Sequence, residues 1–386
     1  MRNLVNVLIA VAIGSAVIAL VLIGGVRRFA GGQAAPSEVP LAETPLSLEE
    51  RMAVIRTTLE GLAAEGEFSG TVLIAADGVP VLQAAYGMAD RSLGAPNRID
   101  TKFNLGSLDK MFTAVAILQL VEQGAVSLDG TVGDYMPDYP NPDVAASVTI
   151  DQLLTHTGGL GDYFDVPGYL DACGEIRSLG DYFALIADEP LLFEPGSRMG
   201  YSNAGYIVLG LVIEAVSGMS YFDYVRDDLF APSGMTDTAC YELDAGVENL
   251  ASGYTNRDWD ENELEEPVAN TSMLPVRGGS AGGGYSTAPD LLAFANALMR
   301  HELLTASSTE LATTGKVSIR DGVSYAYGFF DRIVEGHRTI GHGGGFPGIC
   351  SMLNIYPDLG YIVVVLSNSD WGCVGVNEAI NEVLLD

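Results

Sequence analysis

The sequence predicts a mixed α/β protein (α+β), in which an antiparallel sheet is flanked by helices and carries an inserted helical lobe. Strand-like runs cluster between residues 70 and 87 and again in about the last ninety residues, with helical patterns between them. Strands at both ends of a chain indicate one sheet built from those two ends. A hydrophobic fraction of 48% in 386 residues allows a large core.

The folded domain is predicted to span residues 48–386 and to open with a helix from Leu48 to Gly66. Apolar residues recur there at helical spacing, and "SLEE" gives a capping box that starts at Ser47. Two strands, "GTVLIAADG" and "VPVLQAAYG", follow and are joined by a tight turn at Asp77-Gly78.

Helical patterns dominate the middle of the chain, and we expect residues 121–284 to form the inserted lobe. A cleft between this lobe and the sheet is a natural place for an active site. The predicted helices are Asp109 to Gln123, Ile150 to Thr155, Ala204 to Ser217, Tyr221 to Phe230 and Ala288 to Leu298.

Strands return near the C-terminus, and a helix from Val376 to Leu384 closes the chain. The predicted strands are "VSYAYGFF", "HRTIGHGG", "GICSMLNIYP" and "YIVVVLSN".

Residues 1–28 are predicted to be a transmembrane anchor or a signal sequence. The segment 4–26 contains no charged residue and no proline, and as a helix it reaches about 34 Å, enough to cross a hydrocarbon core of about 30 Å. A cleaved leader, with a cleavage site after Ala34, is the alternative. Residues 29–47 read as a flexible linker. We therefore expect a single-pass membrane protein whose domain lies outside the cytoplasm, or a secreted protein if the leader is removed.

The charge balance excludes one class of partner. The chain has 19 basic and 50 acidic residues, for a net charge of −31, so we expect no nucleic-acid binding. The sequence does not indicate an oligomeric state. Four cysteines allow three disulfide pairings, which the sequence leaves open, and their spacing matches no zinc pattern. These cysteines are Cys173, Cys240, Cys350 and Cys373.

The stretch "NLGSLDKMFT" places a serine and a lysine three residues apart at the start of a predicted helix. Residues at this spacing stand on one helix face, so Ser107 and Lys110 can meet. A serine hydroxyl needs a base to become a nucleophile. Desolvated lysine can be that base, whereas arginine cannot lose its proton. The alternative is a purely structural role, in which the serine caps the helix and the lysine side chain is solvated.

Two further motifs suit the same chemistry. Tyr201 and Asn203 lie just before a predicted helix, where a tyrosine can shuttle protons and an asparagine can hold a substrate carbonyl or orient the lysine. The glycines of "GHGGGFPG", Gly341 to Gly348, allow a main-chain N–H to approach an oxyanion. Each motif alone also fits a structural role.

The order Ser-x-x-Lys, Tyr-x-Asn, His-Gly-Gly resembles the serine β-lactamase and penicillin-binding-protein superfamily, in particular the branch with class C β-lactamases, D-amino-acid peptidases and family VIII esterases. The likeness covers about Leu48 to the C-terminus and includes blocks such as "IDQLLTHTGGL" and "LFEPGSRMGYSNAGYIVLGLVIEAVSG". The resemblance implies a β-lactamase/transpeptidase-like fold, with an antiparallel sheet and a helical lobe.

The resemblance also implies roles for residues. Ser107 would be the acylated nucleophile, Lys110 its base and Tyr201 a proton relay, while Asn203 would contact the substrate. The N–H groups of Ser107 and Gly345 would form the oxyanion hole. The reaction would be acyl transfer through a covalent acyl-enzyme, with no metal and no cofactor.

His342, Gly343 and Gly344 align with the family's third motif and would bind substrate. β-Lactamases carry Lys-Thr-Gly there, and a histidine with a pKa of about 6.5 is mostly neutral at pH 7.5. The substitution weakens the case for β-lactam hydrolysis and fits small esters, amides or peptidoglycan-type D-amino-acid peptides. A true β-lactamase, and a membrane-bound sensor that is acylated without turnover, remain the alternatives.

Two other residues look catalytic at first sight. Ser280 in "GGSAG" matches the nucleophile elbow of α/β-hydrolases, but no buried strand is predicted directly before it, so we do not expect it to be the nucleophile. His156, at a helix end before two glycines, is expected to be a structural hydrogen-bonder rather than a general base.

Overall fold

The computed structural model describes residues 46–258 and 262–386. The predicted anchor or signal sequence (1–28) and linker residues 29–45 lie outside the described residues, so these remain predictions. Across the described ranges, no single helix is both long and apolar enough to cross a membrane. Asn203–Ser217 and Tyr221–Ser233 meet that criterion only as a pair, and the pair is bent by 82°.

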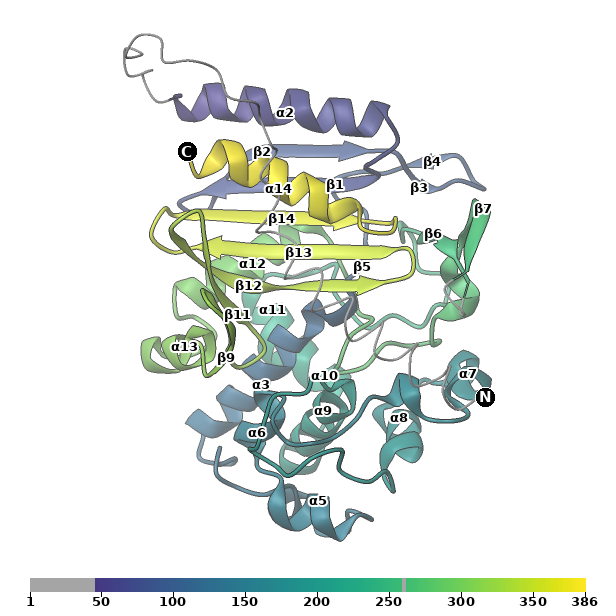
Figure 1. The fold of residues 1–386 in the computed structure, drawn as a ribbon, viewed down its shortest axis with the longest axis vertical. Coiled ribbons are helices and arrows are strands. Elements are labelled where there is room, and N and C mark those ends of the chain that lie inside the picture. The colour runs from purple at the N-terminus through teal and green to yellow at the C-terminus, as the bar shows by residue number, and fades with distance from the viewer. Residues whose placement is uncertain (1–45, 259–261) are drawn as a thin grey trace, which may run out of the picture.

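An eight-stranded antiparallel sheet forms one half of the molecule (Figure 1), in the order β2-β1-β14-β13-β12-β11-β10-β9. Strand β1, from the start of the domain, pairs with β14, from its end, in register from Gly70↔Ser367 to Ala76↔Tyr361. The prediction of one sheet built from both chain ends is therefore confirmed. The strands are β1 (Gly70–Ala76), β2 (Val79–Tyr86), β9 (Val317–Arg320), β10 (Val323–Tyr325), β11 (Phe330–Val334), β12 (His337–Phe346), β13 (Ile349–Tyr356) and β14 (Tyr361–Ser367).

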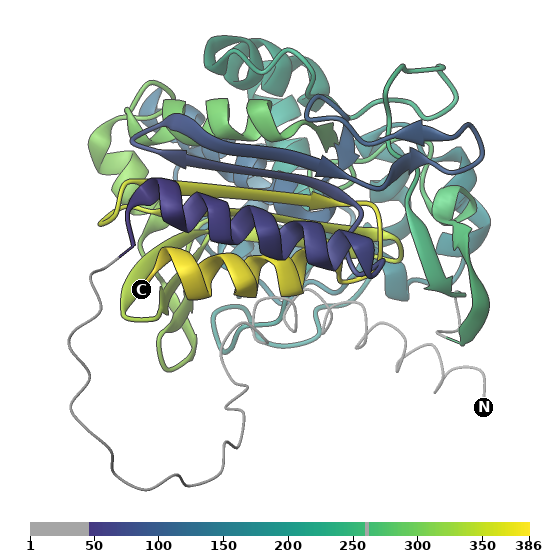
Figure 2. The same ribbon diagram turned by 90° about the horizontal axis from the view of Figure 1, so that it is seen from above.

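Helices cover both faces of this sheet. Helix α2 (Leu48–Ala64), which begins with the predicted capping box at Ser47, lies beside α14 (Gly372–Leu384) across one face (Figure 2). Helix α12 (Ala288–Met299) packs on β1 and β14 from the other face. A disulfide between Cys350 of β13 and Cys373 of α14 ties one helix to the sheet, and Cys173 and Cys240 are free thiols.

Short helices make up most of the chain between residues 110 and 233, and they pack as a lobe below the sheet (Figure 1). Three two-stranded pairs lie outside the large sheet: β3–β4 (Met88–Asp90 and Ala95–Pro96), β5–β8 (Phe103–Asn104 and Tyr285–Ser286) and β6–β7 (Tyr254–Arg257 and Glu263–Ala269). The helices of the lobe are α3 (Lys110–Glu122), α4 (Val132–Tyr135), α5 (Pro142–Ser147), α6 (Ile150–Leu154), α7 (Tyr169–Ala172), α8 (Leu179–Ile186), α9 (Asn203–Ser217), α10 (Tyr221–Val225) and α11 (Ala231–Ser233), and α13 (Ala306–Thr313) packs against α3.

Two predictions about the C-terminal strands are wrong in detail. "VSYAYGFF" is not one strand, because β10 ends at Tyr325 and the chain turns before β11. Gly328, at a φ of +74°, makes this turn and packs so closely on the Lys110 carbonyl that a Cβ would lie 2.6 Å from its oxygen. The strand predicted as "HRTIGHGG" extends two residues further, because β12 continues to Phe346 and only Pro347-Gly348 form the turn to β13.

Candidate active site

Ser107 lies in a short 3-10 turn, Gly106–Asp109, that leads from β5 into α3. The Asn104 side chain starts this turn by accepting the Gly106 N–H at 2.9 Å. Gly106 has a φ of +52°, and a Cβ there would lie 3.0 Å from the main-chain nitrogen of Gly345. Both facts call for glycine at this position. The turn therefore packs closely against the main chain of β12 at Gly345, and it holds the predicted nucleophile beside that strand.

Lys110, the first residue of α3, is fully buried beneath this turn. Its Nζ lies 3.2 Å from Ser107 Oγ, 2.6 Å from Asn203 Oδ1 and 2.5 Å from the carbonyl oxygen of Ala281. Burial lowers the pKa of Lys110 from 10.5 to about 7, although Asp162 and Asp109 oppose this change. The amine is therefore poised to be neutral near neutral pH.

The three neighbours of Lys110 match the needs of a neutral amine. Such an amine has two N–H donors and one lone pair, and two of its neighbours, the Ala281 carbonyl and the Asn203 amide oxygen, can only accept. The third neighbour, the Ser107 hydroxyl, can donate. When both N–H groups point to the carbonyl oxygens, the lone pair faces the proton of Ser107.

Asp162 sets the orientation of Asn203 and was missed in the sequence. The Asn203 Nδ2 donates to Asp162 Oδ2 at 2.6 Å, so the amide oxygen faces Lys110. Burial raises the pKa of Asp162, while the Phe164 N–H, the charge of Lys110 and the Asn203 amide oppose this rise. The three residues form one chain, Asp162–Asn203–Lys110, that ends at Ser107, the predicted nucleophile.

Tyr201 packs over Lys110, whose Nζ lies 4.9 Å from the centre of its ring. Burial raises the pKa of Tyr201 well above 10, and the nearby Ser107 hydroxyl reduces the rise. No hydrogen bond to the buried Tyr201 hydroxyl is formed among the described residues. The hydroxyl is therefore a neutral phenol with its proton available.

The ring of His156 packs against the ring of Tyr201, with the two ring centres 4.2 Å apart. Its Nδ1 accepts the N–H of Ser202 at 3.1 Å, which leaves the proton on Nε2. Burial, together with the charges of Lys110 and His342, lowers the pKa of His156 well below 6.5. This position agrees with the expected structural role.

His342 was expected to bind substrate, but in the structure the residue is buried, with 1% of its surface exposed. Its ring lies 3.2 Å from the Tyr325 hydroxyl and 2.5 Å from the Gly343 carbonyl oxygen. Burial lowers its pKa to about 3, so the ring is neutral. Among the described residues, His342, Gly343 and Gly344 do not line the pocket in front of Ser107, whereas Gly345 does.

Gly344 has a packing role instead. A Cβ at this position would lie 1.8 Å from the carbonyl oxygen of Leu105, two residues before Ser107. The Ser351 hydroxyl donates to that same carbonyl at 2.6 Å. The glycine therefore lets the turn that carries Ser107 dock against β12.

Ser280 is not positioned as a nucleophile. It is fully buried, and its hydroxyl donates to the Tyr206 carbonyl at 2.8 Å. The glycine-rich segment around it instead supplies the Ala281 carbonyl that holds Lys110. It also supplies the Gly284 N–H, which donates at 2.5 Å to Asp109, a carboxyl whose pKa burial raises to about 7.

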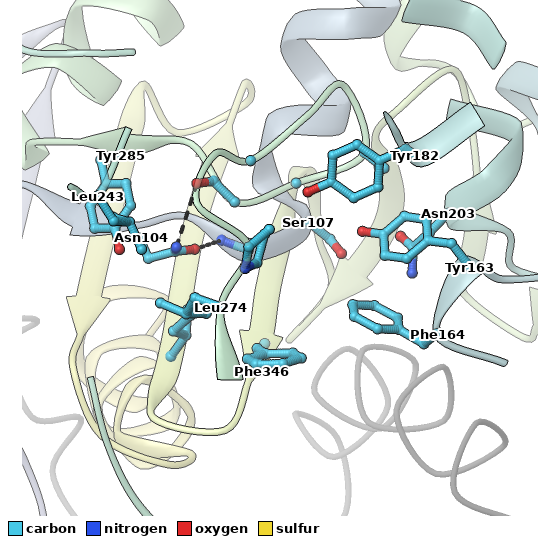
Figure 3. Close-up of a pocket in the computed structure, with 18 of the residues that line it drawn as sticks. Asn104, Ser107, Tyr163, Phe164, Tyr182, Asn203, Leu243, Leu274, Tyr285 and Phe346 are labelled. Carbon is cyan, nitrogen blue, oxygen red and sulfur yellow. Dashed lines mark hydrogen bonds between the residues drawn. The ribbon is translucent and has the colours of Figure 1, made fainter. Parts of the chain in front are cut away.

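A cavity of about 630 Å³ opens in front of Ser107 (Figure 3). Its walls come from the turn that carries Ser107, the helical lobe, the glycine-rich segment 278–283 and the end of β12. In Figure 3, Tyr163, Phe164 and Tyr182 gather near Asn203, and Leu243 and Tyr285 lie on the opposite side of Ser107. The lining residues are Asn104, Gly106, Ser107, Tyr163, Phe164, Tyr169, Tyr182, Asn203, Tyr241, Leu243, Leu274, Pro275, Gly278, Ala281, Gly282, Gly283, Tyr285, Gly345, Phe346 and Ile349.

The described part of the chain holds no group of three or more His, Cys, Asp or Glu side chains arranged to bind a metal ion. The ionisable groups near Ser107 instead include Lys110, Asp109 and Asp162.

Comparison with known proteins identifies the family of this chain. Residues 55–378 match the family model described as Beta-lactamase. The chain is 32% identical over 330 residues to penicillin-binding protein 4* of Bacillus subtilis (strain 168), a match that covers 82% of this chain and 71% of the relative.

A solved structure and an esterase show the same likeness. The crystal structure of a penicillin-binding protein from Bacillus halodurans superposes with a TM-score of 0.75 at 36% identity, covering 85% of this chain and 98% of the other. The chain is also 36% identical over 196 residues to esterase EstB of Burkholderia gladioli, across 47% of this chain and 49% of the esterase. The relatives therefore include both penicillin-binding and ester-cleaving proteins.

Proposed function

The chain belongs to the Beta-lactamase family, a family of hydrolases with penicillin-binding, amidase and esterase members, and we propose that it cleaves esters or amides through an acyl-enzyme on Ser107. One observation carries this proposal. The buried amine of Lys110 lies 3.2 Å from Ser107 Oγ and donates to two carbonyl oxygens, so that in its neutral form its lone pair can face the Ser107 hydroxyl. This is the arrangement that a general base needs.

In the first step, Lys110 takes the proton of Ser107 as Oγ attacks the substrate carbonyl carbon. The negative charge moves to the carbonyl oxygen. The tetrahedral intermediate then collapses, the bond to the leaving group breaks, and the leaving group receives a proton from the Tyr201 phenol or from Lys110. Tyr201 suits this task because its raised pKa keeps it protonated.

The N–H groups of Ser107 and Gly345 would stabilise the oxyanion. Phe346 and Ile349 close the two-residue turn, so in the alternation of an antiparallel pair the Gly345 N–H points away from β13. Strand β11 runs beside β12 only from His337 to Gly341, which leaves the later main chain open toward the pocket. Removing one oxyanion donor typically costs about 10²–10³ in rate.

In the second step, water attacks the acyl-enzyme. Lys110 or Tyr201 accepts its proton, and Ser107 leaves with its proton restored. The sensor alternative differs only here, because an acylated sensor would not complete this step.

The test uses the full-length protein with 4-nitrophenyl butyrate and a fluorophosphonate. We expect steady turnover, and a single fluorophosphonate adduct on Ser107 detected by mass spectrometry of the peptides. Ser107→Ala should lose both, whereas Ser280→Ala should keep both. An adduct that persists in Ser107→Ala would refute the assignment. A stoichiometric burst without turnover would favour the sensor.

A further inference from the structure

Among the described residues, those that form the walls of the pocket in front of Ser107 include no ionisable acid or base other than tyrosine. Of the described residues that line it, the polar ones are asparagine, serine, tyrosine and glycine main chain. The charges closest to Ser107 lie behind the walls and are already engaged. Lys110 is surrounded by three partners, and Asp109 accepts the Gly284 N–H.

Apolar surface lies on both sides of Ser107. On the side of Asn203, the rings of Tyr163 and Phe164 lie 4.5 Å apart, and Phe164 stacks on Phe346 at 5.7 Å (Figure 3). On the other side, Leu243 and Leu274 form the wall with Tyr285. An acyl transfer places the acyl group and the leaving group on different sides of the nucleophile. Both groups therefore meet apolar walls.

A charged group on either side would lose its hydration without gaining an ionic partner. Burying a carboxylate or an ammonium without such a partner is strongly unfavourable. For anions, the net charge of −31 adds long-range repulsion. A D-Ala-D-Ala peptide or a penicillin brings a carboxylate, and a free D-amino-acid amide brings an ammonium group. The pocket offers a counter-charge to neither.

We propose that the substrates of this site are uncharged on both sides of the scissile bond, with an apolar group of about ring size on at least one side. This inference rests on the proposed function, because it takes Ser107 as the nucleophile. It places the protein with esterases and neutral amidases, apart from carboxypeptidases and β-lactamases.

The experiment compares esters of matched shape on the full-length protein. On the acyl side, 4-nitrophenyl 4-methylpentanoate is matched with 4-nitrophenyl hemisuccinate, in which a carboxylate replaces the terminal isopropyl group. On the leaving side, the 4-nitrophenyl ester is matched with its 3-carboxy-4-nitrophenyl analogue. A 4-aminobutyrate ester tests the cation. We expect each charged ester to have a kcat/KM at least about a hundredfold lower than its neutral match, corrected for spontaneous hydrolysis.

Single variants then test the cause. Phe164 and Leu274 are half-buried, one on each side of Ser107. Phe164→Lys or Leu274→Lys should raise kcat/KM at least about tenfold for the carboxylate ester whose charge lies on the side of the new lysine. Neither variant should raise kcat/KM for the ammonium ester. Circular dichroism verifies that each variant is folded.

The outcomes separate the two proposals. Equal rates on neutral and charged esters, all lost in Ser107→Ala, would overturn the substrate inference and leave the proposed function standing. Hydrolysis that survives Ser107→Ala would overturn the proposed function. Discrimination against the anionic esters that disappears in 0.5 M salt, with none against the ammonium ester, would also overturn the inference, because it would show long-range repulsion instead of the pocket walls.

Discussion

Ser107 and Ser280 are two buried serines in glycine-rich segments, and Lys110 contacts both segments. Its Nζ lies 3.2 Å from the hydroxyl of Ser107 and 2.5 Å from the carbonyl of Ala281, the residue after Ser280. The two hydroxyls differ in what faces them. Ser107 faces an amine with a lowered pKa and an open pocket, whereas Ser280 donates to the main-chain carbonyl of Tyr206. A short glycine-serine motif therefore says little about reactivity until the acceptor of its proton is known.

The largest expected effect comes from removing that acceptor. Lys110→Arg keeps a cation at the site but cannot release its proton, so we expect kcat/KM for 4-nitrophenyl butyrate to fall by about 10³–10⁴. Lys316→Arg is the matched control, because Lys316 lies away from Ser107, with its Nζ over the Tyr327 ring. It should retain full activity. If Lys110→Arg kept more than a tenth of the activity, Lys110 would not be the base.

A paired glycine substitution tests how each serine is held. In Gly344→Ala, the new Cβ meets the Leu105 carbonyl at 1.8 Å and must move the turn that carries Ser107. A displacement of about 1 Å is expected to cost about 10²-fold in kcat. In Gly210→Ala, the Cβ meets Ser280 Oγ at 2.3 Å and Leu179 Cδ1 at 2.6 Å. This overpacking should cost about 1–3 kcal/mol of stability while activity stays within about tenfold.

Both glycine variants are measured by single-turnover kinetics and by urea unfolding. The comparison fails if Gly210→Ala loses as much activity per folded molecule as Gly344→Ala. In that case the segment of Ser280 would position Ser107 as strongly as β12 does.

The pH profile sharpens the comparison further, since only Ser107 depends on a titrating partner. Lys110 acts as a base only when neutral, so kcat/KM should fall as the pH drops below about 7. The negative charge of Asp162 raises the pKa of Lys110, so Asp162→Asn should move this acid limb to lower pH. The measured quantity is the pH at which kcat/KM falls, and not the maximal rate. This distinguishes the electrostatic effect on Lys110 from the effect of a less well held Asn203 side chain.

Asp165→Asn is the control for this profile. Asp165 is exposed at the surface, but partial desolvation of its carboxyl and the nearby charge of Asp162 raise its pKa to about 6. Removing it leaves the contact between Asp162 and Asn203 in place, so the limb should stay where it is. A limb that moves to higher pH in Asp162→Asn would contradict the assigned chain of residues.

Much of the fold could be predicted because its signals are local. The apolar spacing and capping box of α2, the Asp77-Gly78 turn and the continuous apolar runs of the last strands appear directly in neighbouring residues. Ser107 and Lys110 are three residues apart, so helical geometry alone brings them together. The turn at Gly328 was missed because its glycine is required by contact with α3, far away in the sequence.

The same limit applies to the site. Asp162 holds Asn203 across 41 residues of chain, Ala281 holds Lys110 across 171, and no local pattern reveals such partners. A carboxylate followed by aromatic residues in "GDYF" was the available signal for Asp162, and it fits a helix start equally well. His342 matches the position of a motif in the sequence, but its ring is buried against the Tyr325 hydroxyl and does not line the pocket, a contact that the motif does not reveal.

The smallest expected effect is that of Ser280→Ala. The variant removes one buried hydrogen bond, from Ser280 Oγ to the Tyr206 carbonyl, and the hydrogen bond from the Thr113 hydroxyl to the Ser280 carbonyl remains possible. We expect a loss of about 1 kcal/mol in the free energy of unfolding and a fall of a few degrees in Tm. Because the Ala281 carbonyl still reaches Lys110, kcat/KM should change by less than about threefold, within the usual effect of a substitution away from the reacting atoms. A larger loss of activity with unchanged stability would mean that the hydroxyl of Ser280, and not only its main chain, holds Lys110 in place.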